Sequence, residues 1–177
     1  MTKLDLWGAA ALVAVLLVAG ASTPAAAQRG QGRGMGGGMM ADPGHQADME
    51  LFHALLDNRE RIVRKVTVLG DGVETVTESD DPEVAKTIQA HVESMSARVK
   101  EARPIHQRDP LFREIFKHSD KIVMKHEVTA KGVRVIETSS DAYVAKLIKA
   151  HAEVIDAFLA NGRSEVMKNH PVPERGR

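Results

Sequence analysis

Residues 84–93 read VAKTIQAHVE, and residues 144–153, 60 positions later, read VAKLIKAHAE. When residues 52–93 are aligned with residues 112–153 at this spacing, 16 of 42 positions are identical and no gap is needed. Self-similarity at a fixed spacing is the signature of an internal repeat. The sequence therefore predicts a tandem duplication.

Each copy has the pattern of a helix, two strands and a second helix. Residues 61–69 carry β-branched side chains at alternate positions, which is typical of a half-buried strand. A hairpin turn over residues 70–72 follows, in which we expect Gly72 to have a positive φ, as Gly132 would in the second copy. The second strands are then residues 73–79 and 133–139.

Aspartates mark the beginnings of the predicted helices. Asp42 and Asp109 are each followed by proline, a pair typical of a helix N-terminus. Asp81 and Asp141 are placed to cap the second helix of each copy. The predicted helices end near residues 59, 100 and 160.

These elements predict a single α+β domain over residues 42–160, with an antiparallel four-stranded sheet, helices packed on one face and pseudo-twofold symmetry. Repeat 1 covers residues 42–100 and repeat 2 covers residues 109–160. We expect the copies to share one core, because an isolated two-stranded hairpin is marginally stable in water. The tail, residues 161–177, contains two prolines and is expected to be irregular.

The N-terminal segment predicts export. Residues 8–21 form a continuous small and apolar run, and residues 25–27 fit an A-x-A cleavage rule, so residues 1–27 are predicted to be a cleaved secretory signal peptide. An uncleaved anchor is the alternative, but the run is shorter than the roughly 20 residues that a membrane span needs. We therefore expect a periplasmic protein with no transmembrane segment after cleavage. The Gly- and Met-rich residues 28–41 are predicted to be a flexible linker.

Composition excludes several classes of function. The chain has 24 basic and 24 acidic residues and 3% aromatic residues, which argues against a nucleic-acid partner. Cysteine is absent, which excludes disulfides, thiolate nucleophiles, Fe–S clusters and covalently attached c-type haem. No hydrolytic or nucleophilic motif is present, so no catalytic residue is assigned and a binding protein is favoured over an enzyme.

His91 and His151 occupy the same place in the two copies. Apolar residues flank each at alternating spacings of four and three, which predicts that both lie on the buried stripe of a helix. Equivalent places about a pseudo-twofold axis would let neutral imidazoles share one metal ion or the two axial positions of a haem. The alternative is that each is a buried histidine hydrogen-bonded to a carbonyl or carboxylate.

A second candidate group lies on the first predicted helix. His45, Met49 and His53 have i, i+4, i+8 spacing and share one helical face. Imidazole and thioether both suit copper, so this group is a candidate copper site, which the methionines of residues 28–41 could close over. The alternative is that Met49 fills the core and the histidines flank it. The weaker candidate ligands are His106, His118, His126 and His170.

The chain resembles a family of small exported bacterial proteins that has no settled activity. The resemblance is carried by GVETVTESDDPEVAKTIQAHVESM (72–95), RPIHQRDPLFREIF (103–116), GVRVIETSSDAYVAKLIKAHAEVIDAF (132–158) and NHPVP (169–173). It spans nearly the whole segment after the predicted signal peptide and implies the same domain boundaries. It implies no catalytic residue.

Together these observations predict a periplasmic metal- or haem-binding protein, with copper first and non-covalent haem second. A periplasmic redox partner or a homodimer would be the expected partner. Two other classes stay open. One is a scaffold or small-ligand module in which the histidines are structural, and the other is an enzyme that uses the same metal or haem.

Overall fold

The structure is a computed structural model that describes residue 42 and residues 44–176. The predicted signal peptide and linker lie outside these residues. Among the described residues, no helix has the length and apolar character needed to cross a bilayer. The elements, besides two single-turn 3-10 helices, are α1 (His45–Asp57), β1 (Val63–Val68), β2 (Gly72–Glu78), α2 (Pro82–Lys100), α3 (Pro110–Lys117), β3 (Val123–Thr129), β4 (Gly132–Thr138), α4 (Ala142–Asn161) and α5 (Arg163–Val166).

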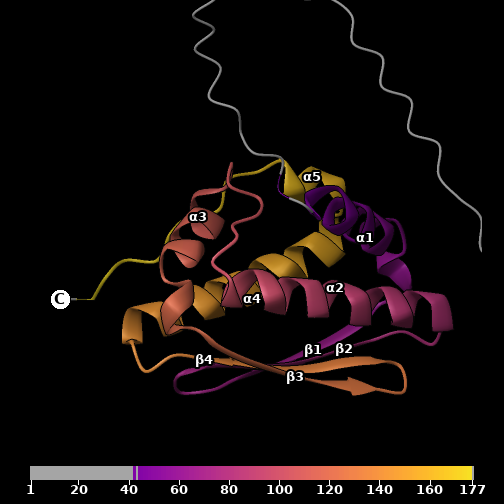
Figure 1. Ribbon diagram of the computed structural model, residues 1–177, viewed down its shortest axis with the longest axis horizontal. Helices are drawn as coiled ribbons and strands as arrows, with labels where there is room; N and C mark the ends of the chain where they lie inside the picture. Colours follow the sequence, from indigo (N-terminus) through magenta and orange to yellow (C-terminus); the bar gives the residue numbers. More distant parts are fainter. Residues whose placement is uncertain (1–41, 43, 177) are drawn as a thin grey trace, which may run out of the picture. The chain divides into compact units, whose positions relative to one another are not determined.

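The four strands form one open antiparallel sheet in the order β1-β2-β4-β3. Figure 1 shows the helices on one face of this sheet, with α2 and α4 directly above the strands. The predicted α+β class and the antiparallel four-stranded sheet are confirmed. The opposite face of the sheet carries the exposed side chains Val63 and Val123, so it lacks a covering layer among the described residues.

Two glycines allow the central strands to pair. In the β2–β4 register, Gly72 lies opposite Thr138 and Gly132 lies opposite Glu78. A Cβ atom on Gly72 would lie 1.9 Å from the carbonyl oxygen of Glu137, and one on Gly132 would lie 2.0 Å from that of Thr77. The expectation of a positive φ was wrong, because the two positions are glycine to permit close approach of a neighbouring backbone and not to permit a left-handed turn.

This close approach predicts a large effect of a single methyl group. Gly132→Ala is expected to lower the free energy of unfolding by about 3 kcal/mol, the upper end of the usual cost of overpacking, because a backbone carbonyl cannot move aside as a flexible side chain can. Gly70→Ala is the matched control, since nothing lies within 4 Å of its Cβ position. Urea unfolding of both variants checks this, and equal stabilities would contradict the account of the central pair.

Aspartate caps begin three helices as predicted. The Asp81 carboxylate accepts hydrogen bonds from the backbone N–H groups of Glu83 and Val84, and Asp141 and Asp109 act in the same way at α4 and α3. Helix α1 differs from the prediction, because it begins at His45 with Gly44 as its N-cap. The Asp42 carboxylate instead forms ion pairs with Arg98 and Arg103.

The core lies between the sheet and the helices. One cluster of buried apolar side chains joins the helices to one another around Leu111, Leu147 and Phe158. The tail predicted to be irregular contains the short helix α5, and its His170 is buried. Two more apolar clusters lie between the long helices and the sheet. One joins Val84 and Ile88 of α2 to Val133 and Val135 of β4. The other joins Val144 and Ile148 of α4 to Val73 of β2.

Candidate functional site

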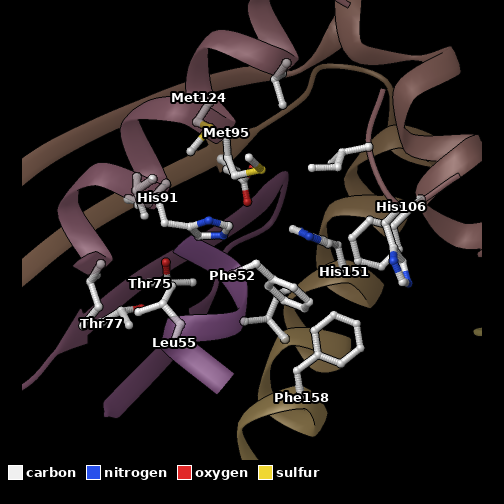
Figure 2. A pocket seen from close by; sticks show the side chains of 18 of the residues that line it. Phe52, Leu55, Thr75, Thr77, His91, Met95, His106, Met124, His151 and Phe158 are labelled. Atoms are coloured by element: carbon white, nitrogen blue, oxygen red, sulfur yellow. The ribbon is translucent and has the colours of Figure 1, made fainter. Parts of the chain in front are cut away.

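A cavity of about 230 Å³ lies between the sheet and the helical layer. This volume is several times the roughly 30 Å³ share of one water molecule and just below the roughly 300–1,000 Å³ of typical small-molecule sites. Its wall is mostly aliphatic, aromatic and thioether side chains, some of which are drawn in Figure 2. The polar or titratable side chains in the wall are Arg64, Thr75, Thr77, His91, His106, Glu137 and His151.

His91 of α2 and His151 of α4 enter this cavity from two different helices (Figure 2). The His91 ring is stacked on Phe52 at a centroid distance of 6.2 Å, and the His151 ring meets Phe112 edge-on at 5.2 Å. Neither imidazole makes a hydrogen bond to any residue that the structure describes, and Nδ1 of His91 is buried without a partner. The carbonyl or carboxylate partner expected of a structural histidine is therefore not found in the described part of the chain.

Both imidazoles are neutral at neutral pH. Burial lowers the pKa of His91 to about 4, although the charge of Asp48 opposes this in part. Burial also lowers the pKa of His151 to about 4, and the nearby Arg64 charge acts in the same direction. A neutral imidazole has an unprotonated nitrogen, which is the form that binds a metal.

Glu137 of β4 is the only carboxylate that the described residues contribute to the cavity wall, and sequence reasoning missed it. Its side chain makes no hydrogen bond or ion pair shorter than 4 Å within the described part of the chain. Burial raises its pKa to about 7, while the charge of Arg64 lowers it in part. The repeat alignment places Thr77 at the corresponding position of the first copy. The change from threonine to glutamate between the two copies was the sequence feature that could have indicated Glu137.

Glu137 should make the stability of the empty protein depend on pH. The carboxyl retains its proton in the folded state up to about pH 7, whereas an unfolded glutamate has a pKa near 4.5. Its contribution to stability is therefore full below pH 4.5 and is lost as the pH rises to 7. Glu137→Gln is expected to be more stable than wild type by on the order of 3 kcal/mol at pH 8, and equal to it near pH 4.5.

Urea unfolding at several pH values checks this prediction. Glu127→Gln is the control, because this β3 carboxylate is 75% exposed. The contributions of His91 and His151 are the same in wild type and variant and cancel in the difference. A stability difference that stayed constant from pH 4.5 to 8 would contradict the assignment.

Arg64 of β1 was also missed. Its side chain is 8% exposed and lies in the cavity wall beneath α4. Its Nη1 donates to the carbonyl oxygen of Ala152 at 3.1 Å and to the carboxylate of Asp156. The cavity therefore has one buried cation in its wall as well as one carboxylate.

The candidate copper group on α1 is divided by the fold. Met49 lines the cavity, whereas His45 and His53 are exposed. Within residues 44–176 no group of three or more histidine, aspartate or glutamate side chains is arranged to hold a metal ion. The structure thus brings Met49 together with His91 and His151 and leaves the other two histidines outside the cavity.

The four weaker histidine candidates have different environments. His106 lines the cavity in the linker between α2 and α3, has φ 54°, and leaves its Nε2 buried without a partner. The remaining three make polar contacts to other side chains. These contacts are His126 with Glu93 at 2.8 Å, His118 with Arg175 at 3.1 Å, and His170 with Asp109 at 2.6 Å and Glu165 at 3.2 Å.

Fold and cavity together define an α+β domain with a mostly apolar cavity lined by three imidazoles, those of His91, His106 and His151, which make no hydrogen bond to a described residue. Comparisons of the chain with protein-family models, with curated proteins and with solved structures found no match.

Proposed function

We propose that the protein binds haem non-covalently in this cavity, with His91 and His151 as the two axial ligands. One observation carries the proposal. Two neutral imidazoles from two helices project into one apolar cavity, and neither has a hydrogen-bond partner among the described residues. Buried polar groups are nearly always paired, so a pair of unpaired ones in a cavity points to a ligand that supplies the partner.

The donor set favours haem over a copper ion, which reverses the order expected from sequence. A macrocycle supplies four nitrogens, so the protein needs to provide only axial ligands, for which histidine is a common choice. The two long helices α2 and α4 each supply one imidazole to the cavity, and the described residues contain no group of three side chains that could hold a metal ion. The mostly apolar wall suits the hydrophobic faces of a porphyrin.

Internal duplication, which we propose for the whole domain, supports shared ligation by two equivalent histidines. Thr75 and Val135, 60 positions apart, lie opposite each other at the centre of the sheet. On either side, the backbone N–H of Ser79 donates to the carbonyl of Lys131 at 2.9 Å, and that of Ser139 donates to Asp71 at 2.9 Å. A pseudo-twofold axis through this pair would relate α2 to α4 and His91 to His151.

Copper is the second candidate, and one observation favours it. Three thioethers line the same cavity as the imidazoles, and thioether and imidazole ligands both suit copper. In this alternative, a methionine of the wall would complete the site. The three residues are Met49, Met95 and Met124.

We further propose that the protein is exported to the periplasm and acts as a carrier or electron-transfer protein, with a redox partner or a second copy as its partner. Export rests on the signal pattern of residues 1–27. A non-enzymatic role rests on the two axial histidines, because they would leave the iron without an open position for substrate.

The test uses the full chain, exported through its own leader and purified without a histidine tag. A visible spectrum and metal analysis of the same sample are expected to show a Soret band and one iron per chain. A colourless sample with one copper per chain would favour the second candidate. A sample that stays free of both after incubation with haemin and with copper would overturn the proposal and favour a scaffold with structural histidines.

A further inference from the structure

The cavity floor has two chemically opposite ends, although the repeat makes their backbone positions equivalent. Arg64 lies opposite Thr77 in the β1–β2 register, and Met124 lies opposite Glu137 in the β3–β4 register. A shift of 60 residues converts the first pair into the second. One end therefore carries a cation and a hydroxyl, and the other carries a carboxyl and a thioether.

The backbone positions of these ends are separated along the sheet, although the long Arg64 side chain reaches far enough for its charge to act on Glu137. Thr77 lies opposite Val133, and Glu137 is four residues further along β4. At about 3.3 Å per residue, the two ends are about 13 Å apart along the strand direction. They also lie towards opposite edges of the sheet, because β1 and β3 are its outer strands.

Arg64 keeps donors available for a ligand. Its two hydrogen bonds, to Ala152 and Asp156, both use Nη1. Its Nε and Nη2 make no hydrogen bond to a residue in the described part of the chain, and a guanidinium has five N–H donors in all. Asp156 is 50% exposed, so solvent screens its charge while Arg64 itself is 8% exposed.

Glu137 disfavours an anion at the other end. Its carboxyl has no hydrogen-bonding partner within residues 44–176, and a second carboxylate beside it would force two like charges into a site of low dielectric constant. A ligand with carboxylates on one edge is therefore attracted to one end of the floor and repelled from the other.

We propose that the cavity binds its ligand in a single orientation, with the ligand's carboxylates at the Arg64–Thr77 end and its apolar edge at the Glu137–Met124 end. This inference rests on the proposed function, since haem carries two carboxylates on one edge. Arg64 is therefore a specificity-determining residue, because its guanidinium binds the carboxylates of the ligand and does not ligate the iron. Charge-assisted hydrogen bonds to a guanidinium supply the discrimination.

The test compares two iron porphyrins, haemin and the carboxylate-free iron etioporphyrin, at pH 8. Arg64→Met places at position 64 the residue found at the equivalent position 124. It is expected to weaken haemin binding by about ten-fold or more and to leave etioporphyrin binding unchanged. Lys65→Met is the matched control, because Lys65 is the next residue of β1 and is exposed on the other face of the sheet. It should change neither affinity.

Two further variants separate charge from packing. Arg64→Lys keeps the charge and should give a smaller loss for haemin than Arg64→Met. Glu137→Gln removes the repulsive charge at the other end and should make haemin binding tighter at pH 8. Equal losses for both porphyrins in Arg64→Met, or no loss for either, would overturn the orientation alone. Failure of the wild-type protein to bind either porphyrin would overturn the proposed function as well.

Discussion

Replacing His151 with alanine is expected to weaken haemin binding by more than about 100-fold. Removing a residue that merely orients a metal ligand typically costs roughly 10–100-fold, and loss of the ligand itself should exceed this. His91→Ala should have an effect of the same size, because both imidazoles line one cavity and neither makes a hydrogen bond to a described residue. Titration with haemin, followed at the Soret maximum, measures both dissociation constants.

His126→Ala is the control for this pair of variants. His126 projects from β3 and contacts Glu93 at 2.8 Å, so it already has a polar partner outside the cavity wall. Its removal should leave haemin affinity unchanged. Wild-type affinity in His91→Ala and His151→Ala would show that the two imidazoles are not ligands, provided that thermal melting shows both variants to be folded.

Replacing Asp48 with alanine is expected to destabilise the domain by about 3 kcal/mol, since it removes the more deeply buried of the two carboxylates, Asp48 and Asp42, that pair with the buried Arg98 charge. The Arg98 side chain is 0% exposed, and its Nε donates to the Asp48 carboxylate, which is 6% exposed. Asp48 also accepts a hydrogen bond from the hydroxyl of Ser94. These contacts fix α1 against α2, and α1 supplies Phe52 to the cavity wall.

Asp57→Ala is the matched control on the same helix. Asp57 and Arg163 form an ion pair in which each side chain is 60% exposed, so its loss should cost less than about 1 kcal/mol. Urea unfolding at pH 7 gives the free energy of unfolding for both variants. Similar small losses in the two variants would mean that the buried network around Arg98 does not hold α1.

Local chemistry explains which parts of the fold could be predicted. The caps at Asp81, Asp109 and Asp141 depend on residues two or three positions away, and sequence alone contains that information. The strands followed in the same way from alternation of side chains within each hairpin. The start of α1 was wrong because Asp42 is drawn into ion pairs with Arg98 and Arg103, which are distant in sequence.

The candidate site depended on contacts between distant residues and was predicted only in part. The helical stripes indicated that His91 and His151 face inward, and both line the cavity. Their lack of hydrogen-bond partners could not be predicted, because it depends on the residues that α1 and α3 place beside them. Glu137 was missed because its position in the cavity wall depends on how β4 packs beneath the helices. The repeat alignment nevertheless pairs Glu137 with Thr77, and this difference between the copies was visible in the sequence.

The most direct test of the central account is the coordination state of iron in the protein reconstituted with haemin. We predict one haem per chain and the spectrum of a low-spin ferric iron with two imidazole ligands, measured by electronic absorption and electron paramagnetic resonance on one sample. A high-spin spectrum with a single histidine ligand, or no bound haem, would contradict axial ligation by His91 and His151.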